Sequence, residues 1–425
     1  MKLKYSFPLL VLLIFCSCKE RSLTDQSDYA VYLNEDANTS NLMEDVTFWT
    51  NKLEANPEQF PYLAKRANVY TKLFDATGNI SYLKKAEQDL TETIALTDNK
   101  MPSYQKQLAA NYISQHRFKE ALQLLKMAEA NGENLSGTKK MLFDVHLELG
   151  NFMIANTYLN QIKNNKDFDY LIRLAKWEDH NGNLEGAILN MESALAIAER
   201  SNLKGIKQWS YTNLADFYGH AGQIEKSYNY YLKALALDPN DAYAKKGIAW
   251  ILYSHEKNTE EALKILDHIS SYYQSPDHAL LKAEIAEFSN DLNLKNKSLI
   301  NFKSELRNKA YGAMYNKHKV LIYTDEFLLP EQALEIAKLE VEQRPTPQSY
   351  DLLAWSYFKL GDVEKANAII EEHVDGKTSE PDVLYHIAEV YKSMGKNEKV
   401  KELKNELVAS LYELGPTMAP KINQL

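Results

Sequence analysis

The chain has 425 residues, of which 45% are hydrophobic and 25% charged, so it holds enough apolar material for two or three domains or one long array. Its formal net charge is −9 at pH 7. Loss of a leader containing Lys2 and Lys4 would make the rest of the chain two units more negative, which disfavours binding to nucleic acid phosphates.

The N-terminus has the layout of an export signal. Two lysines precede an apolar run over residues 7–15, and small residues follow that run. The run is shorter than the roughly 20 residues that a membrane-spanning helix needs. No later stretch is apolar over about 18 residues, so the exported body is predicted to be soluble.

The end of this signal resembles that of a bacterial lipoprotein. The sequence FCSC at residues 15–18 places the small Ser17 before Cys18, as in signals that are cleaved before a cysteine that is then diacylated. The Lys-Glu pair at residues 19–20 is similar to the start of the export tether of Bacteroidetes-type envelope lipoproteins. The resemblance implies a signal peptide over residues 1–17, a lipid anchor on Cys18, and an outer membrane lipoprotein that faces the periplasm or the cell surface. A plain signal peptide cleaved elsewhere is the alternative.

The segment that follows is predicted to be a tether. Residues 18–41 are polar, rich in Asp, Asn and Ser, and lack a sustained apolar period, which indicates a lipidated, flexible spacer that holds the body away from the membrane. From residue 42 onward, apolar residues recur with helical spacing, and no Val/Ile/Thr alternation is long enough for a sheet.

A repeating pattern of residue types runs through the helical part. Relative to Ala215 as an anchor, a leucine lies one position before, a tyrosine three after, a glycine seven after, and an alanine nineteen after. The small residues suit the closest approach of two antiparallel helices, and the larger ones form the apolar stripe between units. Five further units fit the same spacing, anchored at Phe143, Ala109, Ala175, Ala354 and Ala388.

These units resemble tetratricopeptide repeats, which are helix-turn-helix units of about 34 residues. The resemblance implies an all-α fold, a right-handed superhelix (α-solenoid) of about ten helix pairs over residues 42–415, with a C-terminal tail at 416–425. Residues 42–57 are predicted to form a lone helix that caps the front. Residues 276–307 keep the helical period but lose most of the repeat pattern, so the sequence leaves open whether the superhelix is continuous there.

The sequence contains no motif that organises a catalytic site. It has no phosphate-binding loop, dinucleotide-binding glycine motif or nucleophile elbow. His255-Glu256 begins like a zinc protease helix, but Thr259 stands where the second histidine is required. His180 and His220 occupy equivalent places in adjacent units, which lie too far apart for direct co-ligation of a metal ion. We therefore predict a protein that is not an enzyme and needs no metal or cofactor.

The repeat resemblance also predicts which side chains line the concave groove. In tetratricopeptide arrays these are first-helix positions six and three before the anchor and one and four after it. Aromatic side chains at such positions suit a peptide-binding surface, because they bury much area at low entropic cost. Packing of these aromatic rings against neighbouring helices is the alternative. The predicted partner-binding residues are Trp209, Thr212, Asp216, Tyr243, Lys246, Trp250, Tyr253, Asp351, Trp355, Phe358, Tyr385 and Glu389.

Together these patterns favour a non-catalytic, membrane-anchored scaffold that binds an extended segment of another envelope protein in its concave groove. The partner is predicted to be a protein or peptide and not nucleic acid. A glycan-binding or small-molecule-binding subunit of an envelope complex is the main alternative, because aromatic platforms also bind sugars. An assembly factor that acts through its convex or edge surfaces is a third. The oligomeric state stays open.

Overall fold

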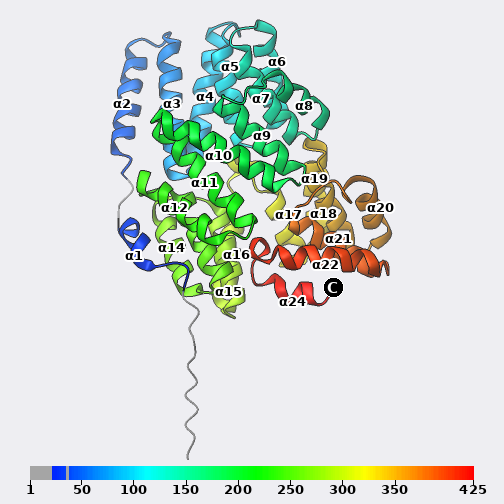
Figure 1. Cartoon of the computed structure of the whole chain (residues 1–425). Coiled ribbons are helices and arrows are strands. Elements are labelled where there is room, and N and C mark those ends of the chain that lie inside the picture. The colour runs from blue at the N-terminus through cyan, green and yellow to red at the C-terminus, as the bar shows by residue number, and fades with distance from the viewer. Residues whose placement is uncertain (1–21, 35–37) are drawn as a thin grey trace, which may run out of the picture.

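A computed structural model describes residues 22–34 and 38–425, and all regular structure in these ranges is helical (Figure 1). The predicted signal peptide and Cys18 lie outside the described residues. A first helix, α2 (Ser40–Ala55), packs on α3, as predicted for the front cap. Within the described residues, ten pairs of consecutive helices follow, which confirms the prediction of an all-α solenoid of about ten helix pairs.

The bounds of the ten pairs follow the repeat pattern. In chain order they are α3 (Phe60–Thr77) with α4 (Ile80–Leu96), α5 (Pro102–Ser114) with α6 (Phe118–Asn131), α7 (Leu135–Glu148) with α8 (Phe152–Gln161), α9 (Phe168–His180) with α10 (Leu184–Ser201), α11 (Lys204–His220) with α12 (Ile224–Leu237), α13 (Ala242–Trp250) with α14 (Thr259–Tyr272), α15 (Pro276–Phe288) with α16 (Leu292–Glu305), α17 (Asn316–Asp325) with α18 (Pro330–Gln343), α19 (Pro347–Lys359) with α20 (Val363–His373), and α21 (Pro381–Ser393) with α22 (Asn397–Ala409). A π-helical turn, η2 (Ile251–His255), extends α13.

Small residues mark the places where paired helices approach most closely. Ala215 on α11 and Ala234 on α12 are fully buried, and the anchors of the other alanine units are buried equally. A side chain larger than alanine at these positions would have to push the helices apart. Between α11 and α12, Gly222 has a φ of +69°, a left-handed conformation that ends the first helix.

The solenoid winds so tightly that successive turns touch. Arg344, just after α18, donates to the Glu148 carboxylate at 2.6 Å, although the two residues lie 196 positions apart. Gln274 N–H donates to the Thr77 carbonyl at 2.7 Å across almost the same separation. Gly182 lies against Ser379 in the same register. One superhelical turn therefore takes about six repeats of 34 residues.

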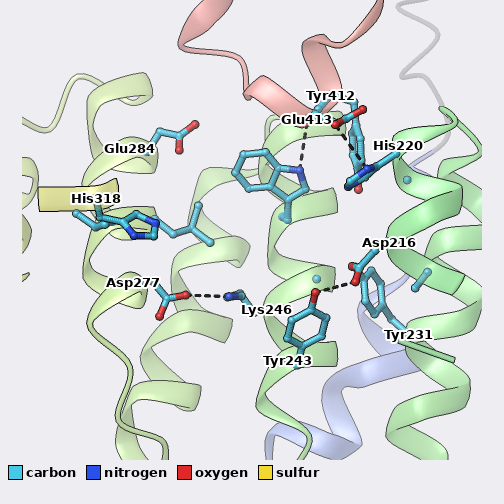
Figure 2. A pocket seen from close by; sticks show the side chains of 16 residues that line it. Asp216, His220, Tyr231, Tyr243, Lys246, Asp277, Glu284, His318, Tyr412 and Glu413 are labelled. Carbon is cyan, nitrogen blue, oxygen red and sulfur yellow. Dashed lines mark hydrogen bonds and ion pairs between the residues drawn. The ribbon is translucent and has the colours of Figure 1, made fainter. Parts of the chain in front are cut away.

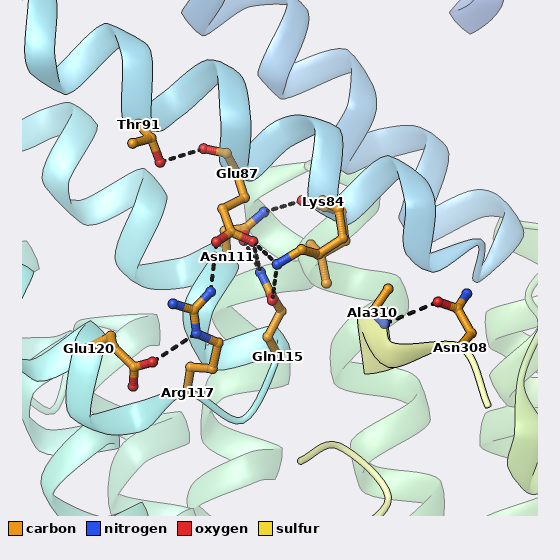
Figure 3. Close-up of polar contacts among 10 residues, drawn as sticks. Lys84, Glu87, Thr91, Asn111, Gln115, Arg117, Glu120, Asn308 and Ala310 are labelled. Carbon is orange, nitrogen blue, oxygen red and sulfur yellow. Dashed lines mark hydrogen bonds and ion pairs between the residues drawn. The ribbon is translucent and has the colours of Figure 1, made fainter. Parts of the chain in front are cut away.

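The superhelix is continuous through residues 276–307. Lys295 on α16 pairs with Glu287 on α15 at 3.1 Å and with Glu326, just after α17, at 2.9 Å. The contacts between turns keep the same register on both sides of this region. The long connection after α16 makes a separate contact. It carries the short helix η3 (Lys309–Tyr311), which packs beside α4 (Figure 3). Tyr311 is buried in one hydrophobic cluster with Ile80 and Leu83 of α4.

The N-terminal strap, which we define as residues 22–34, corrects one prediction. It contains α1 (Gln26–Tyr29) and η1 (Ala30–Leu33), which lie beside α12 and α14 (Figure 1). Thr24 donates through its N–H and its hydroxyl to the Glu256 carboxylate, at 2.7 and 2.9 Å, and Tyr29 is only 2% exposed. The prediction of a flexible spacer over residues 18–41 is thus wrong for the strap, because its few apolar side chains find a tertiary partner.

The C-terminal residues return to the solenoid. The chain after α22 forms α23 (Leu411–Leu414) and α24 (Met418–Asn423), so the predicted tail at 416–425 is itself packed. Ile422 is fully buried in a core cluster with Leu407 of α22. None of the helices in the described ranges combines the length and the apolar character that a membrane crossing requires.

Candidate functional site

The first helices of four consecutive pairs enclose a cavity of about 450 Å³ on the inner side of the superhelix. Its walls come from α11, α13, α15 and α17, and Tyr231 of α12 and residues 412–413 at α23 complete the lining (Figure 2). The side chains that give this concave cavity its chemistry are Asp216, His220, Tyr231, Tyr243, Lys246, Trp250, Asp277, Glu284, His318, Tyr412 and Glu413.

Four of the predicted groove residues meet in the concave cavity: Asp216, Tyr243, Lys246 and Trp250. Trp209 does not line it. This tryptophan is 42% exposed on α11 and contacts Phe168 edge to face, with ring centroids 6.1 Å apart. The cavity therefore takes one of the predicted α11 residues and three of the predicted α13 residues, and it leaves out the start of α11.

Thr212 and Tyr253, also predicted to bind a partner, are buried within the chain. Thr212 donates its hydroxyl to the Trp209 carbonyl of its own helix at 3.0 Å. Tyr253 is fully buried and donates to Glu284 at 3.0 Å. The expectation that these two side chains face a partner is corrected, because each is buried and donates its hydroxyl to another group of the chain.

Asp351 and Trp355 of α19 are likewise buried. The Asp351 carboxylate pairs with His386 Nδ1 at 2.8 Å, and the His386 ring stacks on Trp355 with centroids 4.1 Å apart. The Trp355 indole N–H donates to Asp325 at 3.1 Å. The alternative, in which groove aromatics pack against neighbouring helices, therefore holds for Trp355, and the prediction that its side chain lines the groove for a partner is corrected.

The last three predicted residues cluster around the same tryptophan, away from the concave cavity. Phe358 stacks on Trp355 with centroids 5.3 Å apart, and Tyr385 lies 6.4 Å from the same ring. Burial raises the pKa of Tyr385, and the neighbouring Glu389 carboxylate raises it further. All three side chains are partly exposed, but none contributes to the wall of the cavity.

Asp216 is held by two phenols rather than by a cation. The hydroxyl of Tyr243 donates to one carboxylate oxygen at 2.7 Å, and the hydroxyl of Tyr231 donates to the other. Burial raises the pKa of Asp216, and the two hydrogen bonds oppose that rise. The carboxylate is thus positioned at the cavity wall by hydrogen bonds from neutral groups.

Lys246 is held by Asp277. Its ammonium lies 2.9 Å from the Asp277 carboxylate across the cavity (Figure 2). Burial works to raise the pKa of Asp277, but Lys246 and the Ser275 hydroxyl outweigh burial, so this pKa is held well below its usual range. The Asp277 carboxylate therefore stays ionised near neutral pH, and Lys246 is already engaged by it.

The inner wall carries further titratable groups. Burial raises the pKa of Glu284 to about 7, against the hydrogen bond from Tyr253. Burial also raises the pKa of Glu413, which lies 3.6 Å from His220 Nδ1. Burial lowers the pKa of His318 to about 4, so this ring is neutral at pH 7, and its buried Nδ1 has no hydrogen-bond partner among the described residues.

The C-terminal segment, defined as residues 410–417, closes one side of the concave cavity. The Trp250 indole N–H donates to the Tyr412 carbonyl at 3.1 Å, and the Ser254 hydroxyl donates to the same oxygen at 2.6 Å. Gly415 lies so close to Glu284 that an added Cβ would come within 2.3 Å of its carboxylate. Trp250 is therefore oriented by a backbone group from the end of the chain.

Sequence reasoning missed Asp277, Glu284 and His318, although a signal for them exists. With Ala283 as the anchor of α15, Asp277 and Glu284 fall at groove positions, but Lys282 replaces the usual leucine before the anchor and hides the unit. His318 lies three positions before Leu321, the anchor of α17, which is also a groove position. Tyr412 and Glu413 lie outside every repeat, and no sequence pattern pointed to them.

No metal centre emerges from the part of the chain that the structure describes. In residues 22–34 and 38–425, no group of three or more His, Cys, Asp or Glu side chains is arranged to hold a metal ion. His180 instead contacts Phe152, with ring centroids 4.3 Å apart, while His220 faces Glu413.

Comparison with known proteins supports the repeat class. Residues 210–241, which comprise the end of α11 and all of α12, match the tetratricopeptide repeat family model. The match covers one helix pair, and the surrounding pairs of this all-α solenoid have the same helix-turn-helix form. No curated protein matches the sequence.

Solved structures with a similar fold come from distant proteins. PilF of Pseudomonas aeruginosa is 15% identical with a TM-score of 0.38, over 51% of this chain and 97% of PilF. Yeast Tom70 is 14% identical with a TM-score of 0.40, over 94% of this chain and 96% of Tom70. A signal transduction ATPase with a tetratricopeptide repeat sensor from Pyrococcus horikoshii is 16% identical with a TM-score of 0.38, over 90% and 56% of the two chains. At these values the likenesses do not extend to function.

Proposed function

We propose that this protein is a non-catalytic scaffold whose concave cavity receives a short segment of another envelope protein. Arrays of tetratricopeptide repeats in general bind other proteins or peptides on an extended surface. The observation that carries the proposal is the convergence of Asp216, Tyr243, Lys246 and Trp250 on one cavity at the inner face. An aromatic side chain among positioned charges is the usual core of a peptide-binding site.

The size of the site sets the length of the bound segment. At about 450 Å³, the concave cavity accommodates one or two side chains and the backbone between them. The C-terminal segment also covers one side of this cavity, where the Trp250 indole N–H donates to the Tyr412 carbonyl. We therefore propose recognition of a few residues of the partner, in place of a long peptide laid along the whole superhelix.

The test compares two tryptophan variants in cells. Tagged wild type, Trp250→Ala and Trp209→Ala are cross-linked in living cells, and the co-purified proteins are quantified by mass spectrometry. Trp250→Ala is expected to lower capture of the partner at least tenfold, because Trp250 lines the cavity. Trp209→Ala is a matched control on the neighbouring first helix, outside the cavity, and should capture as wild type does.

The outcomes separate the candidate functions. Equal capture by both variants at equal abundance would contradict cavity recognition and favour an assembly factor that acts through its convex or edge surfaces. The cavity volume also lies within the range of small-molecule sites, which favours the glycan or small-molecule candidate as the second function. Absence of any captured protein, with an increase of the melting temperature by oligosaccharides, would select that candidate.

We further propose that the protein is anchored by a lipid on Cys18, which lies outside the described residues. Thr24, which the structure ties to Glu256, lies six positions after this cysteine, so the chain between them reaches at most about 20 Å. An anchor at Cys18 would thus hold the α12–α14 side of the solenoid close to the membrane. This geometry replaces the expected spacer over residues 18–41, because the strap occupies residues 22–34 of it.

Replacement of the anchoring residue tests this proposal. Cys18→Ser is expected to abolish incorporation of labelled palmitate and to move the protein from the membrane pellet to the soluble fraction, since a covalent acyl anchor is lost. Cys16→Ser is the matched control and should change neither property. Retained labelling in Cys18→Ser, or its loss in Cys16→Ser, would contradict the assignment.

A further inference from the structure

The concave cavity holds an excess of negative charge that the described part of the chain does not balance. Its wall carries four carboxylates, from Asp216, Asp277, Glu284 and Glu413. Among the described residues of that wall, Lys246 is the one lysine or arginine, and it pairs with Asp277 at 2.9 Å.

The other three carboxylates lack a strong cationic partner. Within the described residues, no lysine or arginine nitrogen lies within 4 Å of the Asp216, Glu284 or Glu413 oxygens. Tyrosine hydroxyls donate hydrogen bonds to Asp216 and Glu284, and His220 Nδ1 lies 3.6 Å from the Glu413 carboxylate. Each carboxylate is largely removed from water, which raises all three pKa values. Buried anions without a counter-ion are costly, and a bound cation would remove that cost.

The aromatic part of the wall suits the same kind of ligand. Tyr231, Tyr243, Trp250 and Tyr412 surround the space between the carboxylates. Lys246 already lies 5.5 Å from the centroid of the Tyr243 ring, so the wall makes one cation–π contact within the chain. Carboxylates next to indole and phenol rings form the usual environment of bound ammonium and guanidinium groups.

We propose that the concave cavity binds a cationic side chain, an arginine or lysine of the partner segment, between Trp250 and the carboxylates of Asp216, Glu284 and Glu413. This assignment rests on the proposed function and names the group that the cavity recognises. An anionic group is disfavoured, because Lys246 is committed to Asp277 and His318 is neutral at pH 7. A divalent metal is disfavoured as well, since no three ligating side chains converge in the described residues.

The test uses two capped pentapeptides, Gly-Gly-Arg-Gly-Gly and the same peptide with citrulline, a neutral isostere, in place of arginine. Isothermal titration of the full chain is expected to show at least tenfold tighter binding of the arginine peptide, because only the guanidinium forms charge-assisted hydrogen bonds. Glu284→Gln should weaken binding of the arginine peptide about tenfold and leave the citrulline peptide unchanged. Glu331→Gln, an exposed carboxylate on α18 outside the cavity, is the control and should bind as wild type does.

The pH dependence supplies an independent readout. Glu284 is protonated below its pKa of about 7, so affinity for arginine should rise between pH 6 and pH 8 in wild type and stay nearly flat in Glu284→Gln. His318 is neutral throughout this interval. The other charged or titratable groups that face Glu284 are Tyr253, Glu287, Lys421, Lys246 and Glu413.

Other outcomes would overturn the assignment. Equal affinity for the arginine and citrulline peptides, or no binding of either at millimolar concentration, excludes a cationic ligand. In that case loss of partner capture by Trp250→Ala would still uphold the proposed function, so the two failures are distinguishable. If Glu284→Gln is misfolded by circular dichroism, Glu413→Gln takes its place, because Glu413 lies on the C-terminal segment rather than within a repeat.

Discussion

Gly78→Ala is expected to destabilise the protein by about 3 kcal/mol, because alanine brings two separate costs to this position. Gly78 has a φ of +65°, and a side chain in that left-handed conformation costs roughly 1–2 kcal/mol. The new Cβ would also come within 2.1 Å of the Gln274 carbonyl oxygen on the next turn of the superhelix. Overpacking of this kind costs about 1–3 kcal/mol.

A second glycine separates the two costs. Gly222 has nearly the same backbone conformation, with a φ of +69°, but no atom of the described residues lies within 4 Å of the place that an added Cβ would take, so Gly222→Ala carries the strain alone. We expect it to cost about 1 kcal/mol, measured for both variants by urea denaturation followed by circular dichroism. If the two variants lost equal stability, contact between turns would not contribute to the fold.

Asp351→Ala is expected to cost about 3–5 kcal/mol, because it removes one partner of a buried ion pair. Asp351 is 2% exposed and lies 2.8 Å from His386, which is 6% exposed and stacks on Trp355. The variant leaves the imidazole buried without its acceptor and opens a space beside the tryptophan. Glu364→Ala, on the neighbouring helix α20, is the control on a carboxylate at the surface and should change stability by less than about 0.5 kcal/mol.

The Asp351–His386 pair also predicts a pH dependence. Burial alone would lower the pKa of His386, but the Asp351 carboxylate outweighs burial, so the pKa is raised above its ordinary value of 6.5. A raised pKa means that the folded state binds the proton more tightly than the unfolded state does. The stability gained in this way is fully present below pH 6.5 and is lost as pH rises through the folded pKa.

Melting temperatures of wild type and Asp351→Ala between pH 6 and pH 9 test this sign. The difference in melting temperature between wild type and Asp351→Ala should be largest near pH 6. It should become smaller as pH rises, since the His386 imidazole loses its charge in the wild type. A gap that widens with pH would contradict a raised His386 pKa. Asp382, Asp325 and Lys317 also act on this pair, so the transition belongs to the cluster as a whole.

The packing of the C-terminal segment and of the strap could not be predicted from the sequence. Tyr412 and Glu413 enter the concave cavity from outside the repeats, and Tyr29 buries itself against Glu261 from a segment of largely polar sequence. Neither segment has a sustained apolar period, because each contributes a few side chains to a surface made by other parts of the chain. A pattern within one segment carries no information about such a distant partner.

The sequence by itself determined the helical pairs and their number, because each pair is specified by contacts within about 34 residues. Ala215, Ala234 and Gly222 mark one pair through local close packing and one left-handed turn. Only the tertiary structure decided which turns touch, because a small rotation per repeat accumulates over 196 positions before Arg344 reaches Glu148. Tertiary packing also decided the site. Trp355 is buried against His386 of α21, whereas Trp250, at the equivalent repeat position, lies on the wall of the cavity beside Tyr412, which is 162 positions further along the chain.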